Sequence, residues 1–310
     1  MVNRVFFFLC FLFKISHYIH GKENADDVFA FVKKMKIRQE ILSSRNNPFV
    51  KWVASLSDKK ERAASRSFFA EGEKLLFEAI RNALPITHIL VCEDKKDKIL
   101  PLIEKALEGF CAGEPEVVIV SFSAFEKIST EKAPEGVITV IKYLDFFSNL
   151  DIIYKEEFFI GEGERAIALC SVRDPGNLGS VIRSAVAFGV DHIVISADSA
   201  DIYNPKTVRS AMGNLFAVKI TVVSDLGAFV KAARESGRRV FAAELTEKAK
   251  SLSEIDLTST DIFMIGNEGH GIPREISGLC DGSVYIPISP KTESLNASVA
   301  AAIFMWEQNK

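Results

Sequence analysis

The chain has 310 residues, of which 48% are hydrophobic and 25% are charged, and its formal net charge is −3. This length suits two domains, and this composition is that of a globular protein that buries apolar cores. The near-neutral charge excludes a uniformly basic nucleic-acid-binding protein, so any contact with nucleic acid must come from a local basic patch.

The N-terminal region contains an apolar run, Val5–Phe13, which follows Arg4 and looks like the start of a secretory signal. Its nine residues are fewer than the ~20 of a membrane-spanning helix. We expect residues 1–35 to be an extension outside any domain, with the true start at Met35. The alternative is a targeting or anchor segment, which would make the protein secreted or membrane-bound; we favour a cytoplasmic protein without a membrane partner.

The cysteines are scattered and form neither a CxxC pair nor a cluster with histidines; they are Cys10, Cys92, Cys111, Cys170 and Cys280. This spacing argues against a disulfide framework and against structural zinc. We therefore expect no metal site.

Residues 36–145 are predicted to form a small α/β domain. Apolar spacing predicts a helix over Leu75–Ile80, with Phe68 and Phe69 as apolar residues at its entry. Short apolar runs predict three strands and one further helix, namely strands Ile86–Cys92, Val117–Val120 and Val137–Leu144 and helix Pro101–Leu107.

Residues 146–165 are mixed and charged, so they are predicted to be a linker, and residues 166–310 form a second α/β domain. Its predicted strands are Ala166–Cys170, His192–Ser196, Phe216–Val223, Arg239–Ala243, Ile262–Gly266 and Ser283–Ile288. Its predicted helices are Gly179–Phe188, Pro205–Ala211, Leu226–Ser236 and Ser294–Glu307. Such alternation is typical of a parallel sheet with helices on both faces.

Three polar clusters in the second domain each follow a predicted strand, where ligands bind to open parallel sheets. They read DPGNLGSVIR at Asp174–Arg183, GNEGHG at Gly266–Gly271 and IPISPKTESLNAS at Ile286–Ser298. In the first, Asn177 is placed to cap a helix and Gly179 to permit close backbone approach. The second lacks the GxGxxG spacing and the P-loop lysine, so it does not indicate a dinucleotide or nucleoside triphosphate site.

In order and spacing the three clusters resemble the motifs of the SpoU (TrmH-type) family of RNA 2′-O-ribose methyltransferases: NxGxxxR, GxEGxG and a final IP…SLNxS. Upstream, Arg66–Lys74 resembles the start of that family's L30e-like RNA-binding domain. The resemblance implies a C-terminal trefoil-knotted methyltransferase domain, S-adenosylmethionine as cofactor, and a homodimer formed through this domain.

The resemblance also implies roles for individual residues. Asn177, Arg183 and Glu268 would be the catalytic set. The cofactor would be held by Gly266, Gly271, Ile286, Ser294, Leu295, Asn296 and Ser298. In this family the arginine is proposed as general base. Because a guanidinium normally stays protonated, a more conservative role for Arg183 is to hold a neighbouring phosphate and stabilise the developing alkoxide.

The RNA-binding residues are predicted from a local basic excess and from the resemblance. Residues 36–74 carry nine Lys or Arg and five Asp or Glu. The predicted RNA contacts are Arg45, Lys51, Arg66, Lys74, Lys206 and Arg209. The last two lie in Tyr203–Phe216, which resembles a stretch that family members place beside the RNA and near the dimer interface.

We expect ribosomal rather than transfer RNA as the substrate, because the N-terminal module resembles that of the ribosomal members. Two alternatives stay open: a base-methylating enzyme of the same knotted class, and a non-catalytic RNA-binding protein that keeps the fold.

Overall fold

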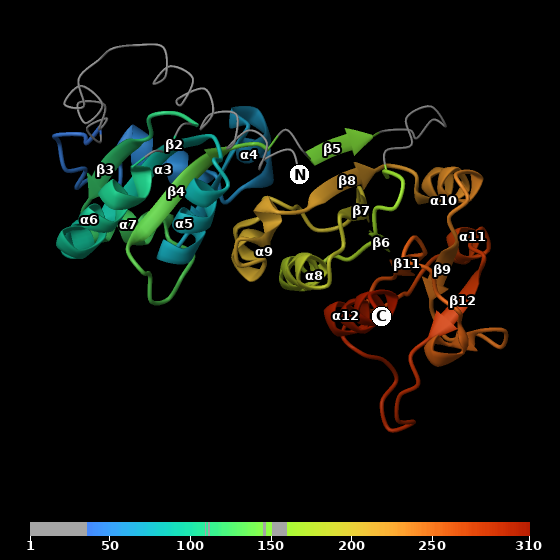
Figure 1. Ribbon diagram of the computed structural model, residues 1–310. Coiled ribbons are helices and arrows are strands. Elements are labelled where there is room, and N and C mark those ends of the chain that lie inside the picture. The colour runs from blue at the N-terminus through green and yellow to red at the C-terminus, as the bar shows by residue number, and fades with distance from the viewer. Residues whose placement is uncertain (1–35, 109, 111, 145–146, 151–159) are drawn as a thin grey trace, which may run out of the picture.

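The computed structural model describes residues 36–310 except 109, 111, 145–146 and 151–159 (Figure 1). The predicted start at Met35 and the apolar run Val5–Phe13 lie outside the described residues, as do Cys10 and Cys111. Cys92, Cys170 and Cys280 are free thiols. Within the described ranges, no helix is both long and apolar enough to cross a membrane.

The N-terminal domain is a four-stranded sheet with helices on both faces (Figure 1). Its strand order is β1-β4-β2-β3, and only the β2–β3 pair is parallel. The strands are β1 (Ser67–Glu71), β2 (Ile86–Cys92), β3 (Glu116–Val120) and β4 (Val137–Lys142). The helices are α3 (Pro48–Ser55), α4 (Lys59–Ser65), α5 (Glu73–Arg81), α6 (Lys96–Leu107) and α7 (Phe122–Ile128), with a 3₁₀ turn, η1, at Glu93–Lys95.

Strand β1 corrects the prediction that Phe68 and Phe69 enter a helix. Phe68 packs in the core on the α5–α6 side of the sheet, and Phe69 packs on the α3–α7 side, each at most 1% exposed. Only a strand sends neighbouring side chains to opposite faces. Helix α5 begins at Glu73, after the strand has ended and two residues before the predicted Leu75. Its N-cap is Gly72, whose φ of +113° suits glycine.

The C-terminal domain is an eight-stranded parallel sheet in the order β10-β12-β9-β11-β6-β7-β8-β5. The strands are β5 (Phe147–Leu150), β6 (Ala166–Leu169), β7 (His192–Ser196), β8 (Lys219–Val223), β9 (Val240–Ala243), β10 (Lys250–Ser251), β11 (Ile262–Ile265) and β12 (Gly282–Tyr285). The helices are α8 (Pro175–Ala187), α9 (Pro205–Ser210), α10 (Leu226–Glu235), α11 (Arg274–Ser277) and α12 (Ala297–Gln308), with 3₁₀ turns η3 (Asn214–Phe216) and η4 (Leu252–Glu254).

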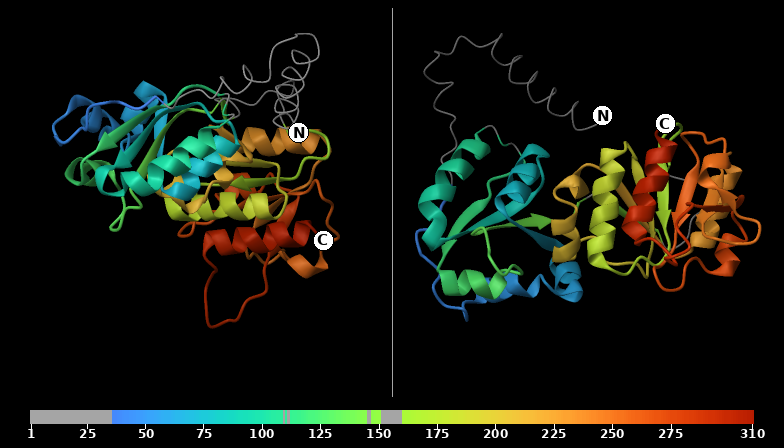
Figure 2. Two further views of the ribbon diagram at one scale, coloured as in Figure 1. Left: turned by 60° about the vertical axis from the view of Figure 1, so that its left-hand side comes forward. Right: turned by 90° about the horizontal axis from the view of Figure 1, so that it is seen from below.

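Two apolar layers sandwich this sheet, as the predicted fold class requires. Helices α8, α9 and α12 pack on one face, and α10 and α11 pack on the other (Figure 2). Strand β11 inserts between β9 and β6, although β7 and β8 separate those two strands along the chain. This order is consistent with the knot that the family resemblance implies, and the threading itself stays a prediction.

The predicted linker, residues 146–165, contains a strand of the second sheet. Strand β5 pairs in parallel with β8 at the sheet edge. Its four residues, FSNL, lack the continuous apolar run that predicted the central strands, because an edge strand is less enclosed. The second sheet therefore begins before the predicted boundary at Ala166.

The two domains share a packed interface built around α9 and the turn before it (Figure 2). Tyr203 stacks on Tyr143 with ring centroids 4.0 Å apart and lies 4.6 Å from Phe68. Its hydroxyl accepts a hydrogen bond of 2.8 Å from the Leu144 amide. The Tyr203–Phe216 stretch, predicted to face RNA and a second subunit, therefore has its first residue buried against the N-terminal domain.

A buried ion pair crosses the same interface. Arg62 of α4 is 1% exposed and pairs with Asp201 at 2.5 Å. Its guanidinium also donates to the carbonyl oxygens of Leu56 and Ser57, each at 2.8 Å. A buried ion pair stabilises a fold little more than apolar residues of similar size would. Removing one partner is nevertheless costly, because the other charge is then buried without a counter-charge.

We predict that Arg62→Ala lowers the free energy of unfolding by about 3 kcal/mol, because it leaves the Asp201 carboxylate nearly enclosed without its cation. Urea unfolding followed by circular dichroism measures the change. Arg81→Ala is the control, since Arg81 is 72% exposed and pairs with Glu78 of its own helix. Equal stability of the two variants would contradict a structural role for the Arg62 pair.

Candidate functional site

The three polar clusters meet at the carboxyl end of the parallel sheet. They follow β6, β11 and β12, and two of these strands, β6 and β11, are hydrogen-bonded neighbours. Parallel strands bring their carboxyl ends to one edge, which is where open α/β sheets bind ligands. The topology therefore gathers segments that lie about a hundred residues apart in the chain.

The first cluster is the start of α8, and its N-cap is Asp174 rather than the predicted Asn177. The Asp174 carboxylate accepts a hydrogen bond from the backbone N–H of Asn177 at 2.8 Å, and Pro175 occupies the first helical position. Lys206 binds the second carboxylate oxygen at 2.8 Å, and this hydrogen bond lowers the pKa of Asp174 below its usual range. The helix thus begins four residues before the predicted Gly179, because proline is favoured in a first turn.

Gly179 has the role predicted for it, which is to permit close backbone approach. A Cβ atom at this position would lie 2.5 Å from the Thr207 carbonyl oxygen and 2.5 Å from Cβ of Ser210. Helix α9 therefore sits directly against α8 at a distance that only glycine allows.

The Asn177 side chain joins all three clusters. Its amide nitrogen donates to the Glu268 carboxylate of the second cluster, and its oxygen accepts from Asn296 of the third at 2.9 Å. Because Asp174 caps the helix, both ends of the Asn177 amide are free for these partners. The structure thus brings together three residues that the sequence analysis assigned to the site.

The second cluster forms a tight loop in which Gly266 and Gly271 touch. A Cβ atom on Gly266 would lie 2.5 Å from the carbonyl carbon of Gly271, and Gly271 has a φ of +66°. Asn267 spans the loop: its oxygen accepts from the Gly269 and His270 amides at 2.8 and 3.2 Å. A side chain at Gly266 would therefore clash with the backbone of Gly271, whereas Gly271 has open space around it and needs glycine for its left-handed backbone.

Ser171 and Asp198 support the site, and the sequence analysis missed both. Ser171 has a φ of +55°, its carbonyl accepts from Asn267 at 2.8 Å, and its hydroxyl donates to Asp198 at 2.6 Å. A non-glycine residue in the left-handed region is held there only by such surrounding bonds. Their position just after two predicted strands was the sequence signal that could have indicated a place at the site.

The third cluster is an extended, mostly exposed loop that ends at the start of α12. Strand β12 stops at Tyr285 rather than at Ile288, and α12 starts at Ala297 rather than at Ser294. Asn296 is the N-cap, and its oxygen accepts from the Ser298 amide at 2.9 Å and the Ser298 hydroxyl at 2.6 Å. Asn296 therefore caps α12 with one end of its amide and binds Asn177 with the other.

The remaining predicted cofactor residues flank this contact. Ile286 and Leu295, at the two ends of the loop, are half-buried, whereas Ser294 is exposed. The loop thus has two half-buried apolar side chains at its ends and exposed residues between them.

Arg183 lies on α8 beyond Asn177, with its side chain exposed. Within the described part of the chain, no acidic side chain pairs with it, so its guanidinium is available to an incoming anion. Arg183 lies six positions after Asn177 along the helix, a rise of about 9 Å.

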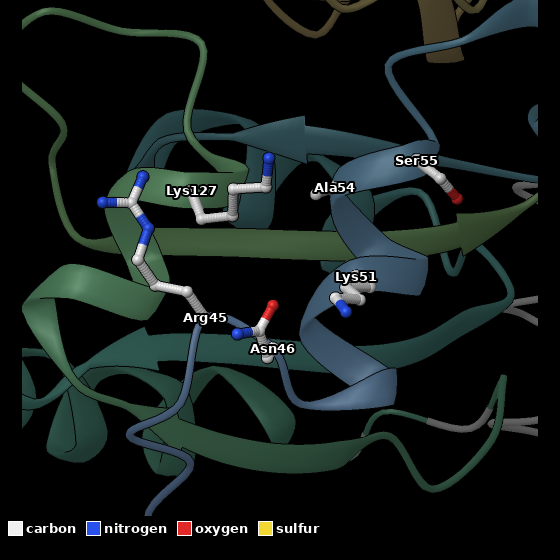
Figure 3. Close-up of a pocket in the computed structure, with 6 residues that line it drawn as sticks. All are labelled: Arg45, Asn46, Lys51, Ala54, Ser55 and Lys127. Atoms are coloured by element: carbon white, nitrogen blue, oxygen red, sulfur yellow. The ribbon is translucent and has the colours of Figure 1, made fainter.

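The predicted RNA-binding cations occupy several places. Arg45 and Lys51 line one hollow of the N-terminal domain (Figure 3). Arg66 is exposed and lies 5.5 Å from the Tyr143 ring, and Lys74 is exposed in α5.

Lys206 and Arg209 have structural partners that the sequence analysis did not foresee. Lys206 pairs with the α8 cap Asp174, and Arg209 pairs with Glu131 of the N-terminal domain. Arg209 thus pairs across the domain interface, whereas Lys206 holds α9 to the start of α8 within the C-terminal domain. Among the residues that the structure describes, no group of three or more His, Cys, Asp or Glu side chains could hold a metal ion.

Comparison with known proteins agrees with this geometry. Residues 164–306 match the SpoU rRNA Methylase family, and residues 47–139 match the MRM3-like substrate binding domain. The chain is 29% identical over 268 residues to the 23S rRNA (guanosine(2553)-2′-O)-methyltransferase RlmP of Bacillus subtilis, covering 86% of this chain and 98% of that protein. It is 28% identical to the 23S rRNA (uridine(2479)-2′-O)-methyltransferase of Streptomyces viridochromogenes, covering 86% of this chain and 90% of that protein.

The fold has solved counterparts as well. The crystal structure of AdoMet-bound rRNA methyltransferase from Sinorhizobium meliloti superposes with a TM-score of 0.71 and 28% identity, covering 88% of this chain and 97% of that one. The family resemblance and the α/β fold class predicted from the sequence are thereby confirmed. The two matched regions follow one another in the chain and correspond to the two domains of the structure. The chain therefore belongs to the SpoU rRNA methylase family and carries an MRM3-like substrate-binding domain in front of its methylase domain.

Proposed function

We propose that this protein transfers a methyl group from S-adenosylmethionine to a ribose 2′-hydroxyl of ribosomal RNA. The observation that carries the proposal is the side-chain amide of Asn177, which binds Glu268 and Asn296 and so assembles three loops at the start of the helix that carries the exposed Arg183. The named 2′-O-methyltransferases of 23S rRNA among the relatives support ribose as acceptor and ribosomal RNA as substrate. Because such RNA is assembled in the cytoplasm of bacteria, we also propose a cytoplasmic enzyme.

The residues present fit the cofactor. Bound S-adenosylmethionine supplies a methyl group on a positively charged sulfur. The space beside Gly271 is open, so a ligand could approach its backbone closely, and half-buried Ile286 and Leu295 would offer apolar surface for a flat ring. Ser294, Asn296 and Ser298 would shape the pocket, and Asn296 is already fixed by its helix cap and by Asn177.

Arg183 is proposed to act on the RNA rather than on the cofactor. An exposed, unpaired guanidinium binds phosphate oxygens in a fork of hydrogen bonds and stabilises negative charge that develops on a neighbouring oxygen. Asn177 and Glu268, which hold each other, keep the start of the same helix in place. Arg183 would thereby orient the ribose and stabilise its alkoxide.

The function is tested by incubating the full chain with methyl-tritiated S-adenosylmethionine and ribosomal RNA that lacks its native modifications. We predict that label enters the RNA and that nuclease digestion with mass spectrometry finds it on a ribose 2′-oxygen. Label on a nucleobase would indicate a base-methylating enzyme. Stable RNA binding without label would indicate a non-catalytic binding protein.

We predict that Arg183→Ala lowers kcat for methyl transfer by about 100-fold or more, as expected when a charge-stabilising group is removed. The Kd for S-adenosylhomocysteine, measured by calorimetry, should change by less than about twofold, because no predicted cofactor residue is removed. Lys231→Ala, an exposed change on α10 across the sheet, is the control. Near-normal turnover by Arg183→Ala would contradict the assignment.

A homodimer through the methylase domain is also proposed. Helices α8 and α12 lie side by side (Figure 2), and a shallow apolar groove between them is lined by Ser184, Phe188, Ser298, Val299, Ala302, Ile303 and Trp306. Val299 is 47% exposed and Trp306 is 53% exposed. Exposed apolar patches of this kind mark protein interfaces.

We predict that Trp306→Glu converts a dimer into a monomer in size-exclusion chromatography with light scattering, because a carboxylate would be buried without a partner in the apolar contact. Lys231→Glu on α10 makes a charge change on the opposite face and should leave the dimer intact. A wild-type monomer would overturn the dimer proposal while leaving the catalytic one in place.

A further inference from the structure

The N-terminal domain has a basic hollow on the sheet face that carries α3 and α7. It is lined by Arg45, Asn46, Lys51, Ala54, Ser55 and Lys127 (Figure 3). The residues come from the loop before α3, from α3 itself and from α7. The volume is about 570 Å³, within the ~300–1,000 Å³ typical of small-ligand sites. We call this feature the α3–α7 hollow.

The lining of the α3–α7 hollow is positively charged and favours binding of an anion. It carries three cationic side chains, and the acid paired with one of them is Glu126, at 3.7 Å from Arg45. That pair is loose, since both side chains are more than half exposed. For Lys51 and Lys127 the described residues offer no ion-pair partner. Gathering like charges around one concavity costs energy unless an anion binds between them.

The chemistry of the lining also selects the kind of anion. Besides the cations, the hollow offers an amide at Asn46 and a hydroxyl at Ser55, and its apolar contribution is Ala54. Ammonium, guanidinium and amide groups all donate hydrogen bonds to phosphate oxygens. None of the six lining residues has a large apolar side chain, so the hollow is unsuited to a lipid chain or to an exposed apolar peptide side chain.

The frame that holds these side chains is rigid. Val50 and Val53 of α3 are fully buried, and they pack in one core with Ala124 and Phe125 of α7. The approach to α3 is fixed by Asn47, whose side chain accepts from the Phe49 amide at 2.9 Å. Since the backbone under the cations is already ordered, binding an anion there costs little further conformational entropy.

We propose that the α3–α7 hollow binds backbone phosphates of the RNA substrate, at a point separate from the methyl acceptor. This inference rests on the proposed function for the identity of the anion. All six lining residues belong to the N-terminal domain, whereas the three catalytic loops lie beyond the interface with α9. One RNA segment would present the ribose to Arg183 while another is held in the hollow.

The proposal has a measurable electrostatic consequence. Each phosphate neutralised by a lysine releases a counterion and contributes about 0.9 to the slope of log K against log salt. Loss of two phosphate contacts should therefore lower that slope by about 2. A substitution that only disturbs packing would not change the slope in this way.

The test uses the full chain with Lys51→Gln and Lys127→Gln combined, which removes charge and keeps length. The matched control is Lys98→Gln with Lys105→Gln, two exposed lysines of α6 on the opposite face of the sheet. Filter binding measures the Kd for an rRNA transcript at several salt concentrations. Methyl transfer gives kcat and KM for the same transcript.

We predict that the hollow variant raises Kd and KM about tenfold at 0.15 M salt, lowers the salt slope by about 2 and leaves kcat within about twofold. A short RNA hairpin that carries only the acceptor nucleotide should bind both variants alike. Lys51→Arg with Lys127→Arg should restore wild-type binding.

Equal behaviour of the hollow variant and the α6 control with the long transcript would overturn the proposal. So would an unchanged salt slope, which would assign any loss of affinity to altered packing. If wild-type protein binds RNA but transfers no methyl group, the proposed function fails, and filter binding still decides the role of the hollow.

Discussion

The hydrogen bonds of the Asn177 amide are the contact on which the rest of the site depends. One side chain binds Glu268 after β11 and Asn296 before α12, so three loops from distant parts of the chain take up one arrangement. This is possible because Asp174 caps α8 in its place. With the loops assembled, the glycine loop lies at the start of α8, and the exposed Arg183 lies further along the same helix.

The same helix connects the candidate site to the substrate-binding domain. Helix α8 carries Asn177 and Arg183, and its Gly179 lies against α9, which in turn packs on the N-terminal domain. Lys206 and Arg209 of α9 bind Asp174 on one side and Glu131 on the other. A continuous apolar core runs through this interface. The substrate-binding domain is thereby held in a fixed relation to α8, as the proposed binding of RNA at two separate points requires.

Much of the architecture could be predicted because buried strands are continuous apolar runs. Ile86–Cys92 and His192–Ser196 have the predicted bounds, since both lie inside their sheets. Errors occur where local pattern and tertiary setting diverge. Phe68 and Phe69 read as the entry to a helix, and β5 read as linker, because a strand lying against another domain or at a sheet edge lacks a distinctive local period. The starts of α8 and α12 differ from the predicted ones, because a helix begins where a side chain reaches the free backbone N–H groups of its first turn.

What the sequence by itself determined is the chemistry: ordered motifs with fixed residue types named the family, the cofactor and the residues to test, since those types are required wherever the chain folds. Only the tertiary structure decided which of these side chains meet. It showed that Asn177 bridges two loops rather than capping its helix, that Lys206 pairs with the cap of α8, and that Arg209 pairs across the domain interface. It also showed that Lys127, about eighty residues from Lys51, shares a hollow with it. Partners that far apart in the chain are chosen by packing of the whole fold, and no local pattern encodes them.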